Sequence, residues 1–398
     1  MEINTNRLFL MFPARMMRMK SNRGIGLYVH VPFCVRKCRY CSFYSEPVGS
    51  VDTGGMVSAM KAELGRYELG EKVDTVYVGG GSPSCLPPAE LFGLLDEITN
   101  RCTDLKEFSV EVNPGQVDGE FLCGLRERRV SRLSIGGQSF VDEELVFLGR
   151  EHTADDILRT FEFGRKAGFS NISIDLIFAI PGSTVDFFRY SLESVIALGC
   201  EHVSAYSFSI EPATAIGRAC EHGEVVKVDE ETDRAMYEMA IDELEGVGIV
   251  QYEISNFASE GFECRHNLKY WSNDPYVGIG PGAASYFRGE RYNNIADIGK
   301  YCELIENGKS AKVDGHRCQG VEAACETAVL NLRKRTGICL TEFAERTGYD
   351  AMELFGETVE RYVREGLMEV SDEDGGRICL SRKALAIADG ILCDFSSV

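Results

Sequence analysis

Short apolar runs rich in β-branched residues alternate with amphipathic stretches over the first half of the chain. These runs predict six strands, at residues 25–31, 73–78, 107–112, 132–135, 172–178 and 202–210. Helical spacing of apolar residues appears between them, for instance at 56–67, 89–99, 154–167 and 184–198. Strict alternation of strand and helix favours parallel βαβ units. Six such units predict an α/β fold built on a partial (β/α)6 TIM-like barrel.

The remainder of the chain divides into shorter regions. A helix predicted at 230–245 ends the barrel, which we place at residues 23–250. Residues 251–319 are aromatic and glycine-rich with weak periodicity, and we interpret them as a linker or extension. From 320 to 398, helical patterns are followed by two short strands around 372–376 and a final helix. This order predicts a small C-terminal α+β, winged-helix-like domain.

Composition and charge exclude several classes of protein. Apolar residues make up 44% of the chain, which supports a folded core, and no run approaches the roughly 20 apolar residues of a membrane span. The net charge is −20, and residues 320–398 carry 9 basic and 15 acidic side chains, so nucleic-acid binding is not expected. Residues 1–22 place basic side chains after a short apolar run, the reverse of a secretory signal. We expect them to form a disordered leader.

The chain contains fifteen cysteines, an odd and high number that favours the reducing cytosol over an oxidising compartment. Most stand alone and are expected to be small buried side chains. Cys34, Cys38 and Cys41 differ, because they form C-x3-C-x2-C directly after the first strand. Structural zinc usually takes four ligands from two pairs, whereas three thiolates on one loop suit a [4Fe–4S] cluster with one open iron. Zinc and a chance grouping are the weaker alternatives.

Unusual residues also follow the other predicted strands. Gly80 and Gly81 come after the second strand, Gln138 after the fourth, and Glu111 and Asp175 lie in the third and fifth. The carboxyl ends of barrel strands are where ligands bind, and glycines let a backbone approach a ligand closely. The alternative for the two carboxylates is that they accept hydrogen bonds from backbone donors at strand ends.

At YVHVPFC (28–34), YVGGGSPS (77–84), EFSVEVNP (107–114), RLSIGGQSF (132–140) and ISIDLIFAIPG (172–182) the chain resembles the radical S-adenosylmethionine (SAM) enzymes, and more narrowly the oxygen-independent coproporphyrinogen III dehydrogenase family. The resemblance implies that Cys34, Cys38 and Cys41 bind the cluster. It also implies that SAM chelates the open iron and is cleaved reductively to give a 5′-deoxyadenosyl radical. The implied SAM contacts are Tyr28, Tyr40, Gly80, Gly81, Ser82, Glu111, Gln138, Arg150 and Asp175.

Two features point to one branch of that family. Phe43 stands where coproporphyrinogen dehydrogenases carry a fourth cysteine, and residues 266–271 read H-N-x-x-Y-W. Both resemble the haem-chaperone branch, whose members bind haem and pass it to apo-haemoproteins. The resemblance makes His266 a candidate haem ligand, with Cys264 as a possible thiolate. The alternative is that the motif is a polar and aromatic cluster that packs one end of the barrel.

The sequence thus predicts a cytoplasmic haem chaperone with a [4Fe–4S] cluster and SAM as cofactors and haem as cargo. Its partners would be apo-haemoproteins, including membrane-bound ones reached by docking, with no nucleic acid; the axial haem ligand and dimerisation are left open. One alternative is a coproporphyrinogen III dehydrogenase that acts on a tetrapyrrole by radical chemistry. Another is a radical SAM enzyme with a different substrate.

Overall fold

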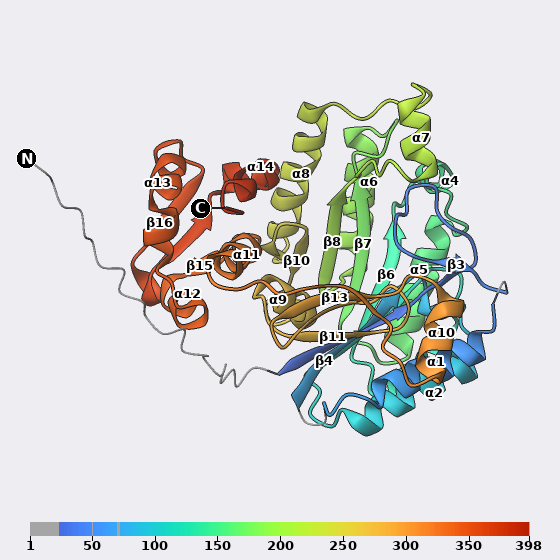
Figure 1. Cartoon of the computed structure of the whole chain (residues 1–398). Coiled ribbons are helices and arrows are strands. Elements are labelled where there is room, and N and C mark those ends of the chain that lie inside the picture. The colour runs from blue at the N-terminus through green and yellow to red at the C-terminus, as the bar shows by residue number, and fades with distance from the viewer. Residues whose placement is uncertain (1–23, 50, 70–71, 398) are drawn as a thin grey trace, which may run out of the picture.

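The computed structural model describes residues 24–49, 51–69 and 72–397, so the predicted leader at 1–22 lies outside the described residues. Six parallel strands lie side by side in chain order in one sheet, which confirms the partial (β/α)6 barrel (Figure 1). They are β1 (Ile25–Val31), β4 (Val73–Gly80), β5 (Glu107–Val112), β6 (Arg132–Gln138), β7 (Ile172–Phe178) and β8 (His202–Ser207).

Helices follow these strands, as the alternating pattern predicts. They are α1 (Thr53–Leu64), α2 (Pro88–Arg101), α3 (Gly119–Glu127), α4 (Asp142–Leu148), α5 (Ala154–Lys166), α6 (Val185–Leu198), α7 (Ala215–Glu221) and α8 (Glu230–Glu245). Alternate strand residues such as Val76, Val110 and Leu133 are buried in the apolar core with helix residues such as Leu94 and Ile157. The intervening strand residues are mostly polar, and they form the site described below.

Residues 250–316 supply the strands at both ends of the sheet. At one end β8 pairs with β10 (Asn256–Ala258), which pairs with β9 (Val250–Glu253). At the other end β11 (Tyr276–Ile279) runs parallel to β1 and is followed by antiparallel β12 (Ala284–Phe287), β13 (Glu290–Asn294) and β14 (Lys312–His316). Helices α9 (Arg265–Trp271) and α10 (Ile298–Glu306) lie within this segment. The predicted linker is therefore largely paired into the sheet.

The C-terminal region combines helices with a small sheet, as predicted for a winged-helix-like fold. The helices are α11 (Val321–Leu332), α12 (Leu340–Thr347), α13 (Ala351–Arg364) and α14 (Ala388–Cys393), and the antiparallel sheet has the order β15 (Ile338–Cys339), β17 (Arg377–Leu380), β16 (Met368–Ser371). Arg346 pairs with Asp274 at 2.6 Å, and Arg382 pairs with Asp242, so ion pairs join this region to the rest. The domain boundaries at 250 and 320 stay predictions.

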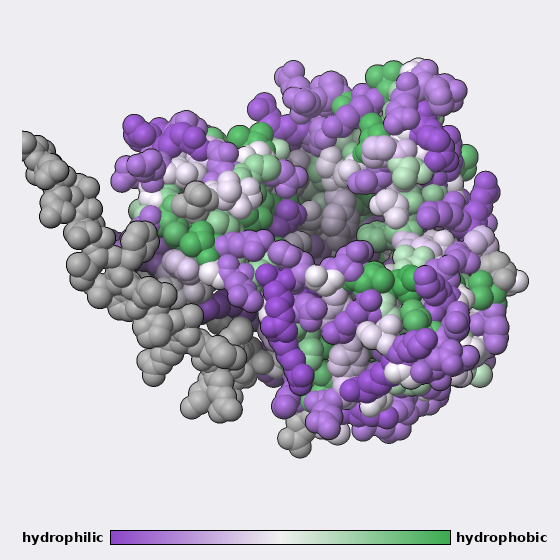
Figure 2. Space-filling view, in the orientation of Figure 1, coloured by the Kyte–Doolittle hydropathy of each residue, from purple (hydrophilic) through white to green (hydrophobic). Residues whose placement is uncertain are grey.

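The surface is largely hydrophilic on the face shown in Figure 2, in keeping with the acidic composition. The same view shows the surface hollowed in front of β7 and β8. Among the residues that the structure describes, no helix is both long and apolar enough to cross a membrane.

Candidate functional site

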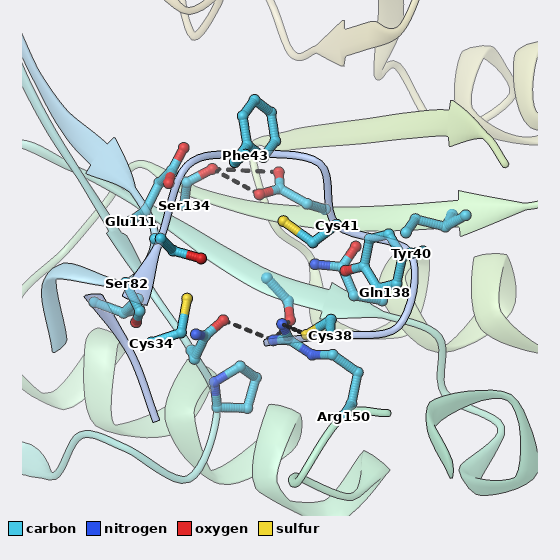
Figure 3. A pocket seen from close by; sticks show the side chains of 18 of the residues that line it. Cys34, Cys38, Tyr40, Cys41, Phe43, Ser82, Glu111, Ser134, Gln138 and Arg150 are labelled. Atoms are coloured by element: carbon cyan, nitrogen blue, oxygen red, sulfur yellow. Dashed lines mark hydrogen bonds between the residues drawn. The ribbon is translucent and has the colours of Figure 1, made fainter. Parts of the chain in front are cut away.

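The three cysteines of the C-x3-C-x2-C motif lie on one loop, here called the cluster loop (residues 34–45). The loop is closed at its base by β2 (Phe33–Cys34) and β3 (Glu46–Pro47), which pair in parallel. It is also fixed to the barrel, because the Arg39 N–H donates to the Leu148 carbonyl at 3.0 Å. Figure 3 shows the sulfur atoms of the cysteines turned toward the space that the loop encloses.

This donor set has the chemistry that an iron–sulfur cluster requires. Cys34, Cys38 and Cys41 are all free, and each is only partly exposed. Burial raises the pKa of the Cys34 and Cys41 thiols, so a metal centre that binds them as thiolates has to displace protons. Soft thiolates on one loop suit a cluster better than magnesium or calcium, which prefer oxygen.

A cavity of about 740 Å³ extends from the cluster loop into the barrel. Alternate residues of the strands line it: Arg132, Ser134, Gly136 and Gln138 on β6, Asp175 and Ile177 on β7, and Ser204 and Tyr206 on β8. This period of two is that of side chains on one face of a strand. Packed barrels usually fill this space with branched apolar side chains, so the polar lining indicates a ligand-binding chamber.

The glycine run after β4 makes room for a carboxylate. A Cβ atom on Gly79 would lie 2.6 Å from Oε2 of Glu111, closer than real contacts allow. Gly80 has φ of +110°, a conformation that other residues rarely adopt, and its N–H donates to Glu111 Oε2 at 3.3 Å. Gly81 and Ser82 line the same cavity. The glycines therefore let β4 pass against Glu111, beside the cluster loop.

Two partly buried carboxylates face the chamber. Glu111 accepts a hydrogen bond from Tyr77 at 2.8 Å, and burial raises its pKa to about 7. Asp175 accepts hydrogen bonds from Ser134 at 3.2 and 3.1 Å, and burial raises the pKa of this carboxyl too. Groups poised in this way can accept hydrogen bonds from ligand hydroxyls or pair with a ligand cation.

Buried Arg132 and partly buried Arg150 carry donors that the protein leaves unused. Arg150 donates to Asn113 Oδ1 at 2.6 Å and to the Gly136 carbonyl at 2.8 Å, and its Nη1 lies 3.6 Å from Cys38 Sγ. Arg150 Nε and the Nε and Nη1 atoms of Arg132 are buried and have no hydrogen-bond acceptor among the described residues. Both side chains line the cavity, and unused buried donors of this kind point to a polar ligand.

The structure brings most of the predicted site residues together. Those that line the cavity are Cys34, Cys38, Tyr40, Cys41, Gly80, Gly81, Ser82, Glu111, Gln138, Arg150 and Asp175. Gln138 has φ of +68° at the end of β6, where the register with β7 shifts, and strain of this kind is common at functional sites. Tyr28 is not among the lining residues; its hydroxyl is 2.9 Å from His30 Nδ1. A SAM contact for Tyr28 stays a prediction.

Other residues of the chamber were not singled out from the sequence. Tyr77, Arg132, Ser134, Ser204 and Asn267 all line it. For Arg132 and Ser134, the alternation of polar and apolar residues at 132–135 is a sequence signal that these two side chains share one face of a strand. Asn267 comes from a helix far along the chain, and no local pattern places it there.

The position of His266 does not support haem ligation. The side chain is fully buried, at 0% exposure, and its Nδ1 and Nε2 atoms lie 2.9 Å from Thr75 Oγ1 and 2.8 Å from Tyr270 Oη. Burial lowers the pKa of this imidazole to about 3. Neither ring nitrogen is free for an iron atom, and Cys264 is equally buried, with its thiol 3.4 Å from Glu107. Haem ligation by His266 stays a prediction, and it would require the imidazole to give up its contact with Thr75 or with Tyr270.

The H-N-x-x-Y-W motif instead joins three parts of the fold. His266 contacts Thr75 on β4, and Lys269 pairs with Asp74 at 2.7 Å. Arg333, at the end of α11, places its guanidinium carbon over the Trp271 ring, 4.7 Å from the ring centre. Thr75 and Asp74 lie near the start of β4, whereas Gly80 ends that strand beside the cluster loop. The motif therefore packs the end of the barrel away from the cysteines.

Comparison with known proteins identifies two families along the chain. Residues 28–195 match the radical SAM superfamily, and residues 321–387 match the HemN C-terminal domain. Among solved structures, the coproporphyrinogen III oxidase HemN of Escherichia coli has a TM-score of 0.81 and 21% identity, and the match covers 94% of this chain and 90% of that one. At this identity the match shows a shared fold.

Curated relatives share the sequence over most of its length. The haem chaperone HemW of Bacillus subtilis is 36% identical, and the match covers 87% of this chain and 93% of the relative. HemW of Lactococcus lactis is 32% identical, over 92% of this chain and 96% of the relative. Because these relatives are more than 30% identical over nearly their whole length, this chain belongs to the HemW family of radical SAM proteins.

Proposed function

We propose that this chain is a haem chaperone that binds haem and delivers it to apo-haemoproteins. The observation that carries the proposal is its similarity, over nearly the whole length, to relatives named haem chaperones. Phe43 supports it, because this apolar side chain stands on the cluster loop where the resemblance places a fourth cysteine in coproporphyrinogen dehydrogenases.

The chamber would hold two cofactors. Cys34, Cys38 and Cys41 would ligate three irons of a [4Fe–4S] cluster, whose chemistry is to supply an electron to bound SAM. Glu111 and Asp175 offer acceptors for ribose hydroxyls or the ammonium group, and Arg150 Nε offers an unused donor. Gly80 and Gly81 would let the backbone approach the ligand.

All fifteen cysteines are free thiols, which supports the proposal of a reducing, cytoplasmic location. The recipients would be apo-haemoproteins, with membrane-bound ones reached by docking. Delivery requires reversible binding, so the haem affinity should permit release to a recipient that holds haem more tightly.

One anaerobic assay separates this function from its rival. Reconstituted protein should give a Soret band that saturates on titration with haem, and should transfer that haem to an apo-haemoprotein. With SAM and a reductant it should convert no coproporphyrinogen III. Formation of protoporphyrinogen, without stable haem binding, would instead establish the coproporphyrinogen dehydrogenase.

A further inference from the structure

Large apolar side chains are exposed around the mouth of the chamber. Phe43 is 66% exposed, Val35 46% and Tyr206 42%, and all three line the cavity. The first two lie on the cluster loop, and Figure 3 shows the Phe43 ring projecting from it. Apolar groups gathered around one opening indicate a ligand that covers them. SAM is strongly polar, so the chamber's proposed cofactor does not account for this rim.

Cationic side chains lie on the same loop. Arg36 and Lys37 are exposed and line the cavity. Arg36 forms no ion pair with any described residue, and the Lys37 ammonium donates to the Phe43 carbonyl at 3.2 Å. The chain as a whole carries a charge of −20, and Glu151 and Glu211 supply carboxylates to the cavity from other segments. An exposed apolar and cationic loop therefore complements a flat apolar ligand with carboxylate groups.

No exposed histidine lines this mouth among the described residues. All six histidines lie in the described part of the chain, and His30, His152, His202 and His266 are buried. Of these four, His152 lines the cavity, but it is only 7% exposed and its Nε2 lies 3.0 Å from the Gly137 carbonyl. His222 and His316 are exposed, and neither is among the residues that line the cavity. A porphyrin held there would be bound through its face and its carboxylates rather than by an imidazole on the iron.

We propose that the cluster loop is the haem-docking surface. The porphyrin face packs on Phe43, Val35 and Tyr206, and the propionates pair with Arg36 and Lys37. This inference rests on the proposed haem function and adds the place and the mode of binding. Haem held without an imidazole ligand is also readily surrendered to a recipient that supplies one.

The first test removes the aromatic ring. Anaerobic, cluster-loaded protein is titrated with haem, following the Soret band, for the wild type, Phe43→Ser and the control Tyr190→Ser. Tyr190 is an aromatic residue on α6 that is 56% exposed and not part of the cavity lining. Phe43→Ser should weaken binding about tenfold or more, since it removes a large apolar contact. Tyr190→Ser should bind as the wild type does. Iron content and SAM affinity, measured on the same samples, report whether the loop is intact.

The second test addresses the propionates. The wild type should bind haem more tightly than haem dimethyl ester, because esterification removes both negative charges. Arg36→Glu should lose this preference, whereas Arg364→Glu, a control on α13, should keep it. Iron-free protoporphyrin IX should bind the wild type with an affinity within about threefold of that for haem, since the contacts proposed do not involve iron.

Particular outcomes would overturn the inference. If the wild type binds haem and both Phe43→Ser and Arg36→Glu bind it equally well, haem docks elsewhere while the chaperone function stands. If Phe43→Ser alters only the sedimentation coefficient, the loop is an interface between copies. A much weaker affinity for protoporphyrin IX would show that an iron ligand dominates. Failure of the wild type to bind haem would refute the proposed function itself.

Discussion

At the scale of single residues, Arg150 contacts both the cluster loop and the strand ends. The resemblance implies that Arg150 contacts SAM, but two of its three side-chain nitrogens already contact the protein, at Asn113, Gly136 and Cys38. Arg150 therefore orders the loop as well as the chamber. The Cys38 thiol that it contacts is the most direct place to test the cluster.

Cys38→Ser should abolish the cluster, because a serine oxygen is a poor replacement for a soft thiolate. Anaerobic reconstitution of the wild type should give about four irons per chain and broad absorbance near 400 nm. Cys123→Ser, at an exposed cysteine on α3, is the matched control and should keep the full iron content. Four irons retained in Cys38→Ser would exclude this thiol as a ligand.

Glu111 predicts that SAM binding depends on pH. Burial raises the pKa of its carboxyl to about 7, and the positive charges of SAM would favour the ionised form and lower that pKa. Binding then releases a proton, so SAM affinity should rise between about pH 6 and pH 8, by up to tenfold per unit of pKa shift. Calorimetry in two buffers of different ionisation enthalpy measures the proton released.

Glu111→Gln is the control for that experiment, since an amide keeps the shape without titrating. Its SAM affinity should be lower than that of the wild type at pH 8 and nearly independent of pH. An equal pH dependence in both proteins would assign the proton to another group.

At the scale of elements, α9 connects the start of β4 to α11. Its His266 imidazole is enclosed between Thr75 and Tyr270. His266→Ala should lower the free energy of unfolding by about 2–4 kcal/mol, through two lost hydrogen bonds and a cavity. Denaturant unfolding measures this change, and haem affinity should not change. Loss of haem binding with unaltered stability would instead support His266 as a haem ligand.

The same residue predicts a pH dependence of stability. The imidazole has a pKa of about 3 when folded, against 6.5 as its ordinary value. The unfolded chain therefore takes up the proton first, and stability contributed by this group is lost as the pH falls below 6.5. His266→Gln, which retains hydrogen-bonding groups, should show a shallower fall in unfolding free energy between pH 6.5 and 4.5.

The elements differ in how far the sequence reveals them. The strands at 25–31, 107–112 and 172–178 were predicted with the observed bounds, because each is a continuous β-rich run. Helices α4, α7 and α9 have seven residues each, too few for two full helical periods, and none was predicted. The strands β9–β14 are also short, so no local pattern identifies them. Strand β11 moreover pairs with β1, which lies far from it in the sequence.

The residues of the functional site also differ in how far the sequence could predict them. The cysteines and the polar residues at the carboxyl ends of strands could be predicted, because loops after parallel strands converge. Arg132 carries only the weak signal of polar and apolar alternation at the start of a strand, and Asn267 could not be predicted, since it belongs to a distant helix. The enclosure of His266 could not be predicted either, because it depends on Thr75, almost two hundred residues earlier.

At the scale of the whole molecule, residues 250–316 close both edges of the parallel sheet. Removing them leaves β8 without β10 on one side and β1 without β11 on the other. Unpaired strand edges promote association between chains. A chain that ends at residue 249 lacks these covering strands and should therefore aggregate. A chain that ends at residue 319 keeps them and should be more soluble. Centrifugation of matched lysates measures the difference, and equal solubility would show that the edges need no cover.

This arrangement determines the order in which strands can pair while the protein is being synthesised. Strand β1 emerges from the ribosome first, yet β11, which covers one of its sides, begins only at Tyr276. One edge of β1 therefore stays unpaired while most of the chain is translated. Contacts between segments so far apart in the sequence also form slowly. A slow codon stretch before β11 would lengthen the time for which this edge stays unpaired. The yield of native protein should thus depend on how fast that part of the message is read.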